Sequence, residues 1–561
     1  MKIAATLQQA LADSLAKAGV QITPQEVSLE FPAEIKNGDY ATGVALKYAK
    51  QAGKAPKVLA EEIVEHLRSS TLLGPTSIQR IEVAGPGFIN FYLAPSELVE
   101  AVEEARREDM WGSNVTLTGK KIMVEYTDPN PFKEFHIGHL MSNAIGESIA
   151  RLLQFSGADV KRANYQGDVG PHVAKAIWGI QKLGVDPSDA AALGKAYTTG
   201  SEAYENNETA KKEIDALNAK VYDRTDAKVN ELYTAGRKAS LEHFEELYKI
   251  LGTKFEHYFF ESETAPRGMK IVQAHLDVFE KSDGAIVYKG EKKGLHTRVF
   301  ITSKGLPTYE TKDLGLAELK AETWPFDKSI TITAHEQADY FAVVKAAMEY
   351  VLPDIAPKIQ HVSHGMMRFA EGKMSSRTGN VITGESLLND LIDAAKVRAA
   401  ESRADDTEKL AQEIAVAAVK YQILKQASGK DIIFDRERAL SLEGDSGPYF
   451  QYAHARAHQV VEKAREQGIT PAIDAKAAPN ELVRLLHRFP EAVEYAAREL
   501  EPHLFTNYLL NFASAFNSWY AQVHILDGTP ETAHKVTIVD AVRRTLKNGL
   551  WLLGIPAPER M

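Results

Sequence analysis

The sequence predicts a multidomain protein of the α/β plus α class, in which an α+β domain precedes a parallel-sheet domain and an all-helical domain follows. The chain has 561 residues, which is too long for one hydrophobic core and indicates three or four domains. The segments "KIMVEYT", "HIGHLMSNAIGESIARLLQFSG" and "ADVKRANYQG" follow one another as strand, helix and strand, the unit of a doubly wound parallel sheet. Residues 386–561 read as helix after helix with no convincing strand, which predicts a helical bundle.

Residues 1–112 alternate helical and strand-like segments, which predicts the α+β domain. The segment "PKVLAEEIVEHLRSS" has helical spacing and places Val58, Ile63 and Leu67 on its apolar side. The segment "IQRIEVAGPGFINFYL" reads as two strands joined by a Gly-Pro-Gly turn. Because "TGKKIMVEYT" then opens a new strand, we expect the domain border near Ser113.

Residues 113–385 form the expected parallel-sheet domain, which is Rossmann-like. Its first helix has Ile145 and Ile149 on one face, and Gly157 suits its C-terminal cap. A charged, helical insertion is expected at about 180–285, and strands return in "GAIVYKG", "RVFITSKGLPTYET", "SITITA" and "IQHVSHGMM". Ligands of such sheets bind at the carboxyl ends of the strands, so we expect the functional site there.

Composition excludes several classes of protein. The chain has no cysteine, which excludes disulfides and thiolate zinc sites and favours an intracellular protein. No run of about 18 apolar residues is present, so no membrane span is expected. The formal net charge of −10 argues weakly against a nucleic-acid partner. A local basic face is nevertheless enough to bind phosphates, so charge alone does not decide the partner.

Two histidines, His136 and His139, stand three residues apart in "NPFKEFHIGHLMSN". A zinc protease would need histidines four residues apart with a glutamate between them, and the pair lacks that pattern. Ordinary surface histidines are the plain alternative. The pair lies on the first turn of a helix that follows a strand, however, where free N–H groups bind anions. Gly138 would let a flat adenine approach the backbone, and Lys133 adds positive charge, so we expect a nucleotide site.

A second candidate nucleotide segment is the loop "GKMSSRTGN", residues 372–380. Its glycines allow movement, and Lys373 would meet the charge that develops as pyrophosphate departs, with Arg377 as the second candidate. A lone "KMSS" would more often be a solvated loop. Its place downstream of "HIGH" favours the functional interpretation.

"HIGH" followed by "KMSSR" resembles the paired signature of the class I aminoacyl-tRNA synthetases, and the whole chain resembles the arginyl-tRNA synthetases within that class. "NGDYATGVALKYAK" and "VAGPGFINFYL" look like their added tRNA-binding domain, and "VEYTDPNPFKEFHIGHL" looks like their first signature region. "GPYFQYAHAR" and the ending "LLGIPAPERM" resemble their anticodon-binding domain. Four separated matches in the right order make the resemblance specific.

The resemblance implies an arginine–tRNA ligase that uses ATP with Mg²⁺, makes arginyl-adenylate, and transfers arginine to the 3′-terminal adenosine of tRNA(Arg). It implies catalytic roles for His136, His139 and Lys373. The implied ATP-binding residues are Lys133, Gly138, His139, His364, Gly365, Met366, Lys373, Ser375 and Ser376. The implied arginine-binding residues are Glu125, Asn130, His136, Tyr309, Asp313 and Gln337. The implied tRNA-binding residues are Phe88, Asn90, Tyr449, Tyr452, Arg456 and Met561. We expect no protein metal site, a cytoplasmic location and a monomer.

Several of these residues have plainer interpretations. Tyr309 is strand-like and would fit a core, and Asp313 would fit the cap of the following helix. Glu125 lies in a strand that should be buried, and a buried carboxylate without a partner is costly, so its burial suggests a cationic ligand. Because a guanidinium-binding pocket rejects lysine by its unmatched polar groups, no editing domain is expected.

The chain departs from the family pattern at Met141, Lys304 and Lys312, where an arginine, an aspartate and an arginine are usual, and in "KMSSR" itself. Apart from the reduced basic content of the "KMSSR" loop, these changes remove no residue to which a substrate or nucleotide contact is assigned. Two rival interpretations are another class I synthetase, such as a cysteinyl-like enzyme, and a catalytically inactive RNA-binding paralogue. The absence of cysteine argues against the zinc site of the first, and the presence of His136, His139 and Lys373 argues against the second.

Overall fold

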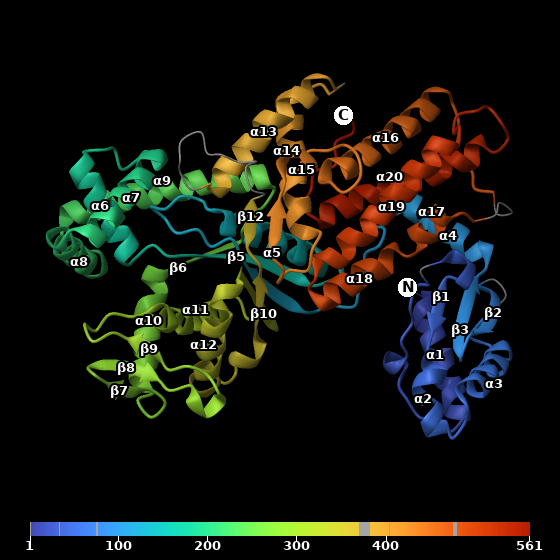
Figure 1. Ribbon diagram of the computed structural model, residues 1–561, viewed down its shortest axis with the longest axis horizontal. Coiled ribbons are helices and arrows are strands. Elements are labelled where there is room, and N and C mark those ends of the chain that lie inside the picture. Colours follow the sequence, from blue (N-terminus) through green and yellow to red (C-terminus); the bar gives the residue numbers. More distant parts are fainter. Residues whose placement is uncertain (1, 33, 75–76, 370–381, 403, 475–478) are drawn as a thin grey trace.

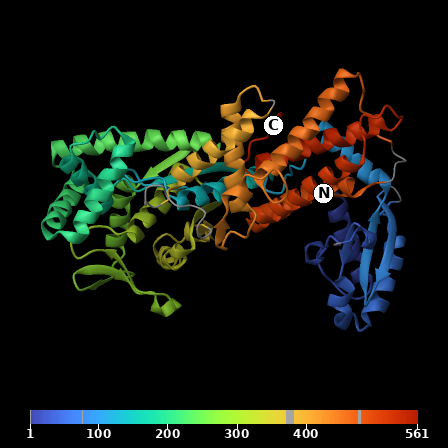
Figure 2. The same cartoon turned by 45° about the horizontal axis from the view of Figure 1, so that its top comes forward.

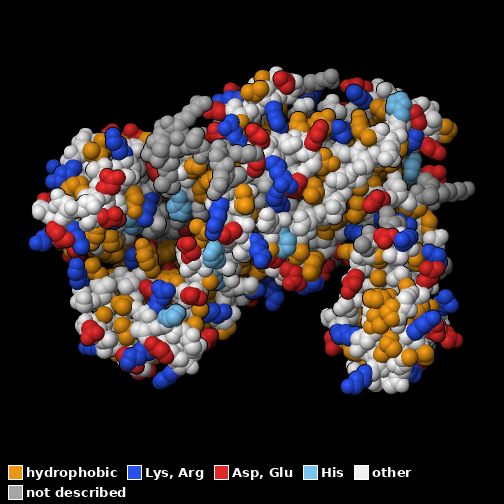
Figure 3. Space-filling model, in the orientation of Figure 1, with side chains coloured by type: hydrophobic (Ala, Val, Ile, Leu, Met, Phe, Trp, Pro, Cys, Tyr) orange, Lys and Arg blue, Asp and Glu red, His pale blue; other side chains and the backbone are white. Residues whose placement is uncertain are grey.

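The computed structural model describes residues 2–32, 34–74, 77–369, 382–402, 404–474 and 479–561. The chain forms three parts in an elongated molecule, with the C-terminal helices between the central sheet and the N-terminal domain (Figure 1). A wide notch separates the N-terminal domain from the central part on the face drawn in Figure 3. No helix in the described ranges is long and apolar enough to cross a membrane.

The N-terminal part is a small α+β unit. Its antiparallel sheet has the order β1-β3-β2, with β1 (Tyr40–Thr42), β2 (Ile78–Ala84) and β3 (Phe88–Leu93). Four helices and two 3-10 turns complete it: α1 (Lys2–Lys17), η1 (Pro24–Glu26), η2 (Ile35–Asn37), α2 (Val44–Ala52), α3 (Pro56–Arg68) and α4 (Pro95–Arg107). The predicted helix over "PKVLAEEIVEHLRSS" is confirmed, but its buried face was misplaced at one position. Leu59, Ile63 and Leu67 are buried, whereas Val58 is 53% exposed.

The N-terminal part is held to the C-terminal helices by buried polar contacts. Arg484 forms an ion pair with Asp39, which is 2% exposed, and the Tyr40 hydroxyl donates a hydrogen bond to Glu491. Helix α4 also packs against two C-terminal helices, α17 (Glu481–His487) and α20 (Thr532–Leu552). Figure 2 shows the same contact region from a second direction.

The centre of the molecule is the expected parallel sheet. Its order is β11-β10-β4-β5-β6, with β4 (Lys121–Glu125), β5 (Asp159–Gln166), β6 (His257–Phe260), β10 (Lys328–Ala334) and β11 (Ile359–His364), all parallel. The chain runs outward from β4 through β5 and β6, and later outward in the other direction from β10 to β11. Open α/β sheets bind ligands where the order reverses, which here is beside β4 and β10.

Helix α5 (Ile137–Phe155) follows β4, as predicted, and is buried on nearly every side. It packs against the sheet at β10 and against α13 (Gly384–Ala400), α14 (Thr407–Leu424) and α18 (Phe489–Glu499). Gly157 follows its C-terminal cap with a φ of +93°, the left-handed conformation that glycine adopts at little cost. The helix that carries the two histidines is therefore fixed between the sheet and the C-terminal helices.

A helical insertion stands between β5 and β6. It contains α6 (Pro171–Leu183), α7 (Ala190–Asn206), α8 (Glu208–Asp223) and α9 (Ala227–Leu251). The insertion that we expected at about 180–285 extends too far, because β6 pairs with β5 in the central sheet and α10 (Glu261–Ala274) follows it.

A smaller lobe carries the wall of the site opposite the histidines. It contains an antiparallel sheet of β7 (Glu280–Ser282), β8 (Ala285–Tyr288) and β9 (Arg298–Ile301), the helices α11 (Tyr309–Thr323) and α12 (Ala338–Val351), and the turns η3 (Glu291–Lys293), η4 (His335–Gln337) and η5 (Ala356–Lys358). The predicted strand "RVFITSKGLPTYET" is wrong in its second half. The strand ends at Ile301, and Thr308 is the N-cap of α11.

The C-terminal part is helical, as predicted. Beyond α13 and α14 it contains α15 (Arg436–Ala439), α16 (Gly447–Glu466), α17, α18, α19 (Pro502–Gln522) and α20. The expectation that no strand occurs after residue 385 is wrong at one place. The three-residue strand β13 (Ile432–Phe434) pairs in parallel with β12 (Met367–Phe369).

Candidate active site

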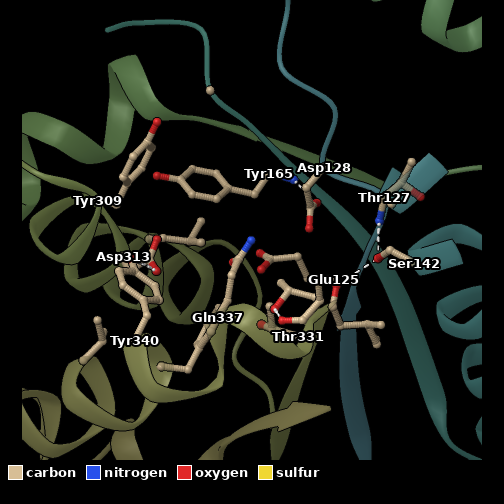
Figure 4. Close-up of a pocket in the computed structure, with 18 of the residues that line it drawn as sticks. Glu125, Thr127, Asp128, Ser142, Tyr165, Tyr309, Asp313, Thr331, Gln337 and Tyr340 are labelled. Atoms are coloured by element: carbon tan, nitrogen blue, oxygen red, sulfur yellow. Dashed lines mark hydrogen bonds between the residues drawn. The ribbon is translucent and has the colours of Figure 1, made fainter. Parts of the chain in front are cut away.

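A cavity of about 580 Å³ lies at the carboxyl ends of the central strands, where the sequence indicated a ligand site. Its walls come from the end of β4, the first turn of α5, the segment after β5, helix α11 and the turn before α12 (Figure 4). The cavity brings together nine of the predicted site residues: Glu125, Asn130, His136, Gly138, His139, Tyr309, Asp313, Gln337 and His364.

The two histidines form a stacked pair at the start of α5. His136 is the N-cap residue, and its ring centroid lies 3.4 Å from that of His139, with 25° between the ring planes. The backbone N–H of His136 donates to Nδ1 of His139 over 3.2 Å, which places the proton of a neutral His139 on Nε2. His139 can therefore donate one hydrogen bond from Nε2 to an anion.

Both imidazoles are neutral near pH 7. Burial is the main reason that the pKa of His136 falls to about 4, and the positive charges of Lys133 and His364 add to the effect. Burial, followed by the charges of His136 and Lys133, lowers the pKa of His139 well below its ordinary value. Near pH 7 the pair can therefore offer hydrogen bonds beside the helix N-terminus, but no imidazolium charge. The described residues include no group of three or more acidic or histidine side chains placed to hold a metal ion.

The loop between β4 and α5 has an unusual backbone. Thr127, Asp128 and Phe132 have φ values of 79°, 49° and 69°, a region that is costly for side chains, above all for a β-branched residue. The backbone N–H of Thr127 donates to Ser142 Oγ over 3.0 Å, and the N–H of Phe132 donates to Ser240 Oγ over 2.9 Å. These bonds to α5 and α9 hold the loop in place.

Asn130 is anchored on the neighbouring strand end. Its Oδ1 accepts from the backbone N–H of Gly167 over 3.0 Å. A Cβ atom at Gly167 would lie 2.4 Å from that oxygen, so a glycine is needed for this close approach.

Glu125 has an internal cationic partner, which corrects our expectation that its burial implies a cationic ligand. Lys320 Nζ lies 2.5 Å from Glu125 Oε2, and both side chains are 3% exposed. A second buried pair borders the cavity, where Lys312 Nζ lies 2.6 Å from Glu261 Oε2 with both side chains 5% exposed. These two pairs neutralise two of the carboxylates of the pocket.

Asp313 and Tyr309 lie on α11, and the structure rules out their plainer interpretations. Asp313 does not cap a helix, because α11 begins at Tyr309 and its N-cap is Thr308. The hydroxyl of Tyr340 donates to Asp313 Oδ2 over 2.6 Å. Burial, the main cause, and the charge of Glu125 raise the pKa of Asp313 to about 7. Tyr309 is not a core residue, since it is 58% exposed at the cavity.

The other predicted nucleotide-binding residues are only partly placed at the cavity. His364 lines it, and its Nδ1 lies 2.7 Å from the carbonyl oxygen of Gly365, but Gly365 and Met366 do not line it. Lys133 also lies outside the lining, with its Nζ 5.1 Å from the ring centroid of Tyr197. The predictions for Lys373, Ser375, Ser376 and Arg377 fall outside the described residues.

The three departures from the family pattern fit their surroundings in the structure. Met141, a residue of α5, is 2% exposed in the hydrophobic core. Lys304 Nζ lies 3.2 Å from Asp215 Oδ2 at the surface, and Lys312 forms the buried pair with Glu261.

The predicted tRNA-binding residues lie far from the cavity, at two places. In the N-terminal part, Phe88 is 38% exposed at the start of β3, whereas Asn90 is only 7% exposed on the middle strand. Tyr449, Tyr452 and Arg456 share helix α16.

Arg456 is held between two aromatic rings on the C-terminal helices. Its guanidinium carbon lies 4.6 Å from the ring centroid of Tyr452 and 4.7 Å from that of Tyr520, and Nη1 donates to Asn517 Oδ1 over 2.5 Å. Met561 packs against the apolar core of the same part.

The residues of the cavity that were missed from the sequence include Asp128, Tyr165, Lys320 and Tyr340. One signal was available for Lys320, because Asp313 and Lys320 are seven residues apart and share one face of α11. Another was available for Asp128, a carboxylate placed directly after a strand that ends at the ligand-binding edge.

The parallel sheet, the histidine pair at the start of α5 and the added helical part define a class I aminoacyl-tRNA synthetase. The catalytic-domain model of class I tRNA synthetases for arginine matches residues 102–436. The arginyl-tRNA synthetase N-terminal domain model matches residues 5–93, and the DALR anticodon-binding domain model matches residues 450–561. The chain belongs to the arginyl-tRNA synthetase family.

Curated relatives and solved structures agree with this assignment. The arginine–tRNA ligase of Clostridioides difficile is 31% identical over 551 residues, and that of Clostridium perfringens is 30% identical over 556 residues, with 96% of both chains covered in each case. The arginyl-tRNA synthetase of Thermus thermophilus superposes with a TM-score of 0.81 at 26% identity, with 99% of each chain covered. The catalytic-domain model that matches is the one for arginine, which argues against the cysteinyl-like alternative.

Proposed function

We propose that the cavity activates L-arginine with MgATP and that the arginyl-adenylate formed there passes its arginine to the 3′-terminal adenosine of tRNA(Arg). One observation carries this proposal. A single cavity joins an anion-binding helix start, with its histidine pair, to an acidic wall of the kind that a guanidinium requires. Family membership supports the same reaction.

In the first step, the arginine carboxylate attacks the α-phosphorus of ATP, and pyrophosphate leaves as the bond between the α- and β-phosphates breaks. The N-terminus of α5 and the Nε2–H of His139 stabilise the negative charge on the phosphate oxygens. We assign Lys373 and the segment around it to the departing pyrophosphate. The protein contributes chiefly by positioning and by charge stabilisation, because displacement at phosphorus needs little covalent help.

We assign arginine binding to the wall of the cavity formed by α11 and α12. Asp313 pairs with the guanidinium, and Tyr340 keeps its carboxylate oriented through the 2.6 Å hydrogen bond. Tyr309 covers the substrate from the open side of the cavity. Asn130, Gln337 and His136 meet the other polar groups of arginine.

In the second step, the 2′-hydroxyl of the terminal adenosine attacks the mixed anhydride and releases AMP. We propose that the tRNA meets Phe88 with its outer corner and meets Tyr449, Tyr452, Arg456 and the Met561 end with its anticodon. Unpaired bases stack on aromatic faces, and arginine can bind base edges or phosphates. Mg²⁺ enters as the counter-ion of ATP. We further propose that the protein acts as a monomer in the cytoplasm, where its tRNA substrate is used.

The proposal is tested by charging purified tRNA(Arg) with radiolabelled amino acids. We expect arginine to be attached, whereas lysine and cysteine are not. His139→Asn should lose charging activity while its fold and its arginine affinity remain. Attachment of cysteine would revive the alternative of a different class I synthetase. Absence of charging by the wild-type protein would support an inactive RNA-binding paralogue.

A further inference from the structure

The chain ends in a segment, residues 554–561, that follows α20 and belongs to no helix or strand. We call it the C-terminal segment. Its residues Pro556 and Pro558 have no backbone N–H and restrict the backbone conformation. Backbone carbonyl groups outside helices and sheets need side-chain or water partners when they are buried. In this segment, buried side chains of α14 and α16 donate to three of the carbonyl oxygens.

Two buried side chains of α16 hold the prolines. Gln451 donates from Nε2 to the carbonyl oxygens of Pro556 and Glu413, over 3.0 Å in both cases. His454, three residues further along the same helix face, has its Nδ1 2.9 Å from the carbonyl oxygen of Pro558. A carbonyl oxygen can only accept, so the proton of His454 is on Nδ1. Burial is the main reason that the pKa of His454 falls to about 4, so the ring is a neutral donor near pH 7.

A third donor, Lys420 on α14, fixes the start of the segment. Its buried ammonium donates to the carbonyl oxygen of Gly554 over 2.9 Å and to that of Leu251, the last residue of α9, over 2.7 Å. A Cβ atom at Gly554 would lie 2.7 Å from Lys420 Nζ, so a glycine permits this close approach. The hydrogen bonds at residues 554, 556 and 558 therefore fix the course of the segment between α14 and α16, which also pack against each other.

The last residues continue along the same two helices, and the C-terminus lies between them in Figure 1. Gln459 Nε2 donates to the carbonyl oxygen of Glu559 over 3.3 Å, and Arg560 forms an ion pair of 3.3 Å with Asp405, just before α14. Met561 then packs against the apolar core. Exposed contacts such as the Arg560 ion pair contribute little, so the buried donors to the two prolines hold the segment most firmly.

We propose that Gln451 and His454 are positioning residues that fix the C-terminal segment between α14 and α16 and so place Met561 for tRNA binding. This inference rests on the proposed function, in which the Met561 end meets the anticodon. A free chain end would lose conformational freedom each time tRNA binds, whereas a held end has already lost it in the free protein. The two residues therefore act on tRNA affinity through the segment and without touching the tRNA.

The test uses variants of the full chain that remove or keep the donor of His454. His454→Leu has no donor. In His454→Asn the amide nitrogen occupies the same position along the side chain as Nδ1, so this variant can keep the bond to Pro558. Gln451→Met removes the other donor with a side chain of similar length, and it takes the place of His454→Leu if that variant does not fold. Deletion of residues 558–561 removes the part of the segment that His454 holds.

We expect His454→Leu to raise the KM for tRNA(Arg) roughly threefold to tenfold, with kcat unchanged, and His454→Asn to restore most of the loss. In the protein without residues 558–561, His454→Leu should raise this KM no further, because those residues transmit its effect. Combined with Phe88→Ala in the distant N-terminal part, the two effects should multiply. Carboxypeptidase should release Met561 faster from His454→Leu than from the wild type.

Four results would each overturn the inference: an unchanged KM in folded His454→Leu, equal losses in His454→Leu and His454→Asn, a further rise of KM on combination with the deletion, or release of Met561 at the wild-type rate. A wild-type protein that charges no tRNA(Arg) would instead reject the proposed function itself.

Discussion

At the scale of single residues, the sequence predicted part of the cavity lining but not its charge balance. Nine predicted residues meet at one cavity because their motifs lie at strand ends and helix starts of a parallel sheet, where topology brings them together. The pairing of Glu125 with Lys320 could not be foreseen, because the two residues are far apart in the sequence and meet only when α11 packs beside β4. Asp128 was missed because its direction depends on a left-handed backbone.

The role of Asp313 leads to a prediction for arginine affinity. Asp313→Asn would remove the proposed charge-assisted hydrogen bond to the guanidinium, and such a bond is worth about 1.5–3 kcal/mol. We expect arginine affinity to fall by one to two orders of magnitude, roughly, while ATP affinity is unchanged. Calorimetric titration checks both ligands, and circular dichroism melting checks the fold. An unaltered arginine affinity in a folded variant would remove Asp313 from the binding wall.

The raised pKa of Asp313 predicts the pH dependence of arginine binding. In the free protein this pKa is about 7, raised by burial first and also by Glu125 and Glu261, and lowered by Tyr340 and Lys320. A bound guanidinium favours the ionised carboxylate, so binding lowers the pKa and releases a proton. Affinity should therefore rise between about pH 6 and about pH 8 and then level off. Titrations in buffers of different ionisation enthalpy measure the released proton, and Asp313→Asn should reduce it. Affinity that falls over this range would contradict the assignment.

At the scale of elements, long periodic segments were predictable and short ones were not. The prediction of α5 is confirmed because its apolar spacing and its glycine cap agree. The strand β13 has only three residues, too few for a periodic pattern, and its existence depends on pairing with β12. The second half of "RVFITSKGLPTYET" was misassigned because helix α11 begins there, at Tyr309.

Helix α16 provides a prediction about the anticodon. Arg456 also contacts Tyr520 and Asn517, so we expect Tyr452→Ala to leave the helix folded. Stacking of one base on tyrosine is worth about 1–3 kcal/mol. The KM for tRNA should therefore rise about tenfold or more, with ATP and arginine affinities nearly unchanged.

Charging kinetics with two tRNAs show why the KM rises. One tRNA has the natural anticodon, and the other is changed at the middle base of the anticodon. If Tyr452 reads the anticodon, Tyr452→Ala slows the charging of the natural tRNA much more than the charging of the changed tRNA. If Tyr452→Ala slows both tRNAs by the same factor, the tyrosine supports the fold alone. Removal of Met561 should act in the same direction as Tyr452→Ala, and more weakly.

At the scale of the whole molecule, the three-part order was evident from the sequence, but the contacts between the parts were not. The N-terminal part is packed against the C-terminal helices, because Asp39 binds Arg484 and Tyr40 binds Glu491. Deleting the first 110 residues would uncover those buried partners and disturb the anticodon-binding part as well. A point variant is therefore the sharper probe of the N-terminal part.

Phe88→Ala tests the N-terminal tRNA contact without exposing that interface. Phe88 is 38% exposed at the start of β3, so its loss should cost little stability but should remove one aromatic face from the tRNA surface. We expect tRNA binding to weaken several-fold in a filter-binding assay, while ATP affinity stays the same. Val115→Ala is the matched control, because Val115 is 77% exposed and belongs to no predicted RNA contact. Equal affinities of the two variants would remove Phe88 from the tRNA surface.

The central claim is that one cavity brings arginine and ATP together for adenylate formation. Exchange of radiolabelled pyrophosphate into ATP measures that step alone, and it is carried out with the full chain, MgATP, arginine and tRNA(Arg). We expect exchange that requires arginine, that neither lysine nor cysteine supports, and that is lost in His139→Asn. A wild-type protein that binds arginine and ATP yet supports no exchange with tRNA(Arg) present would contradict it.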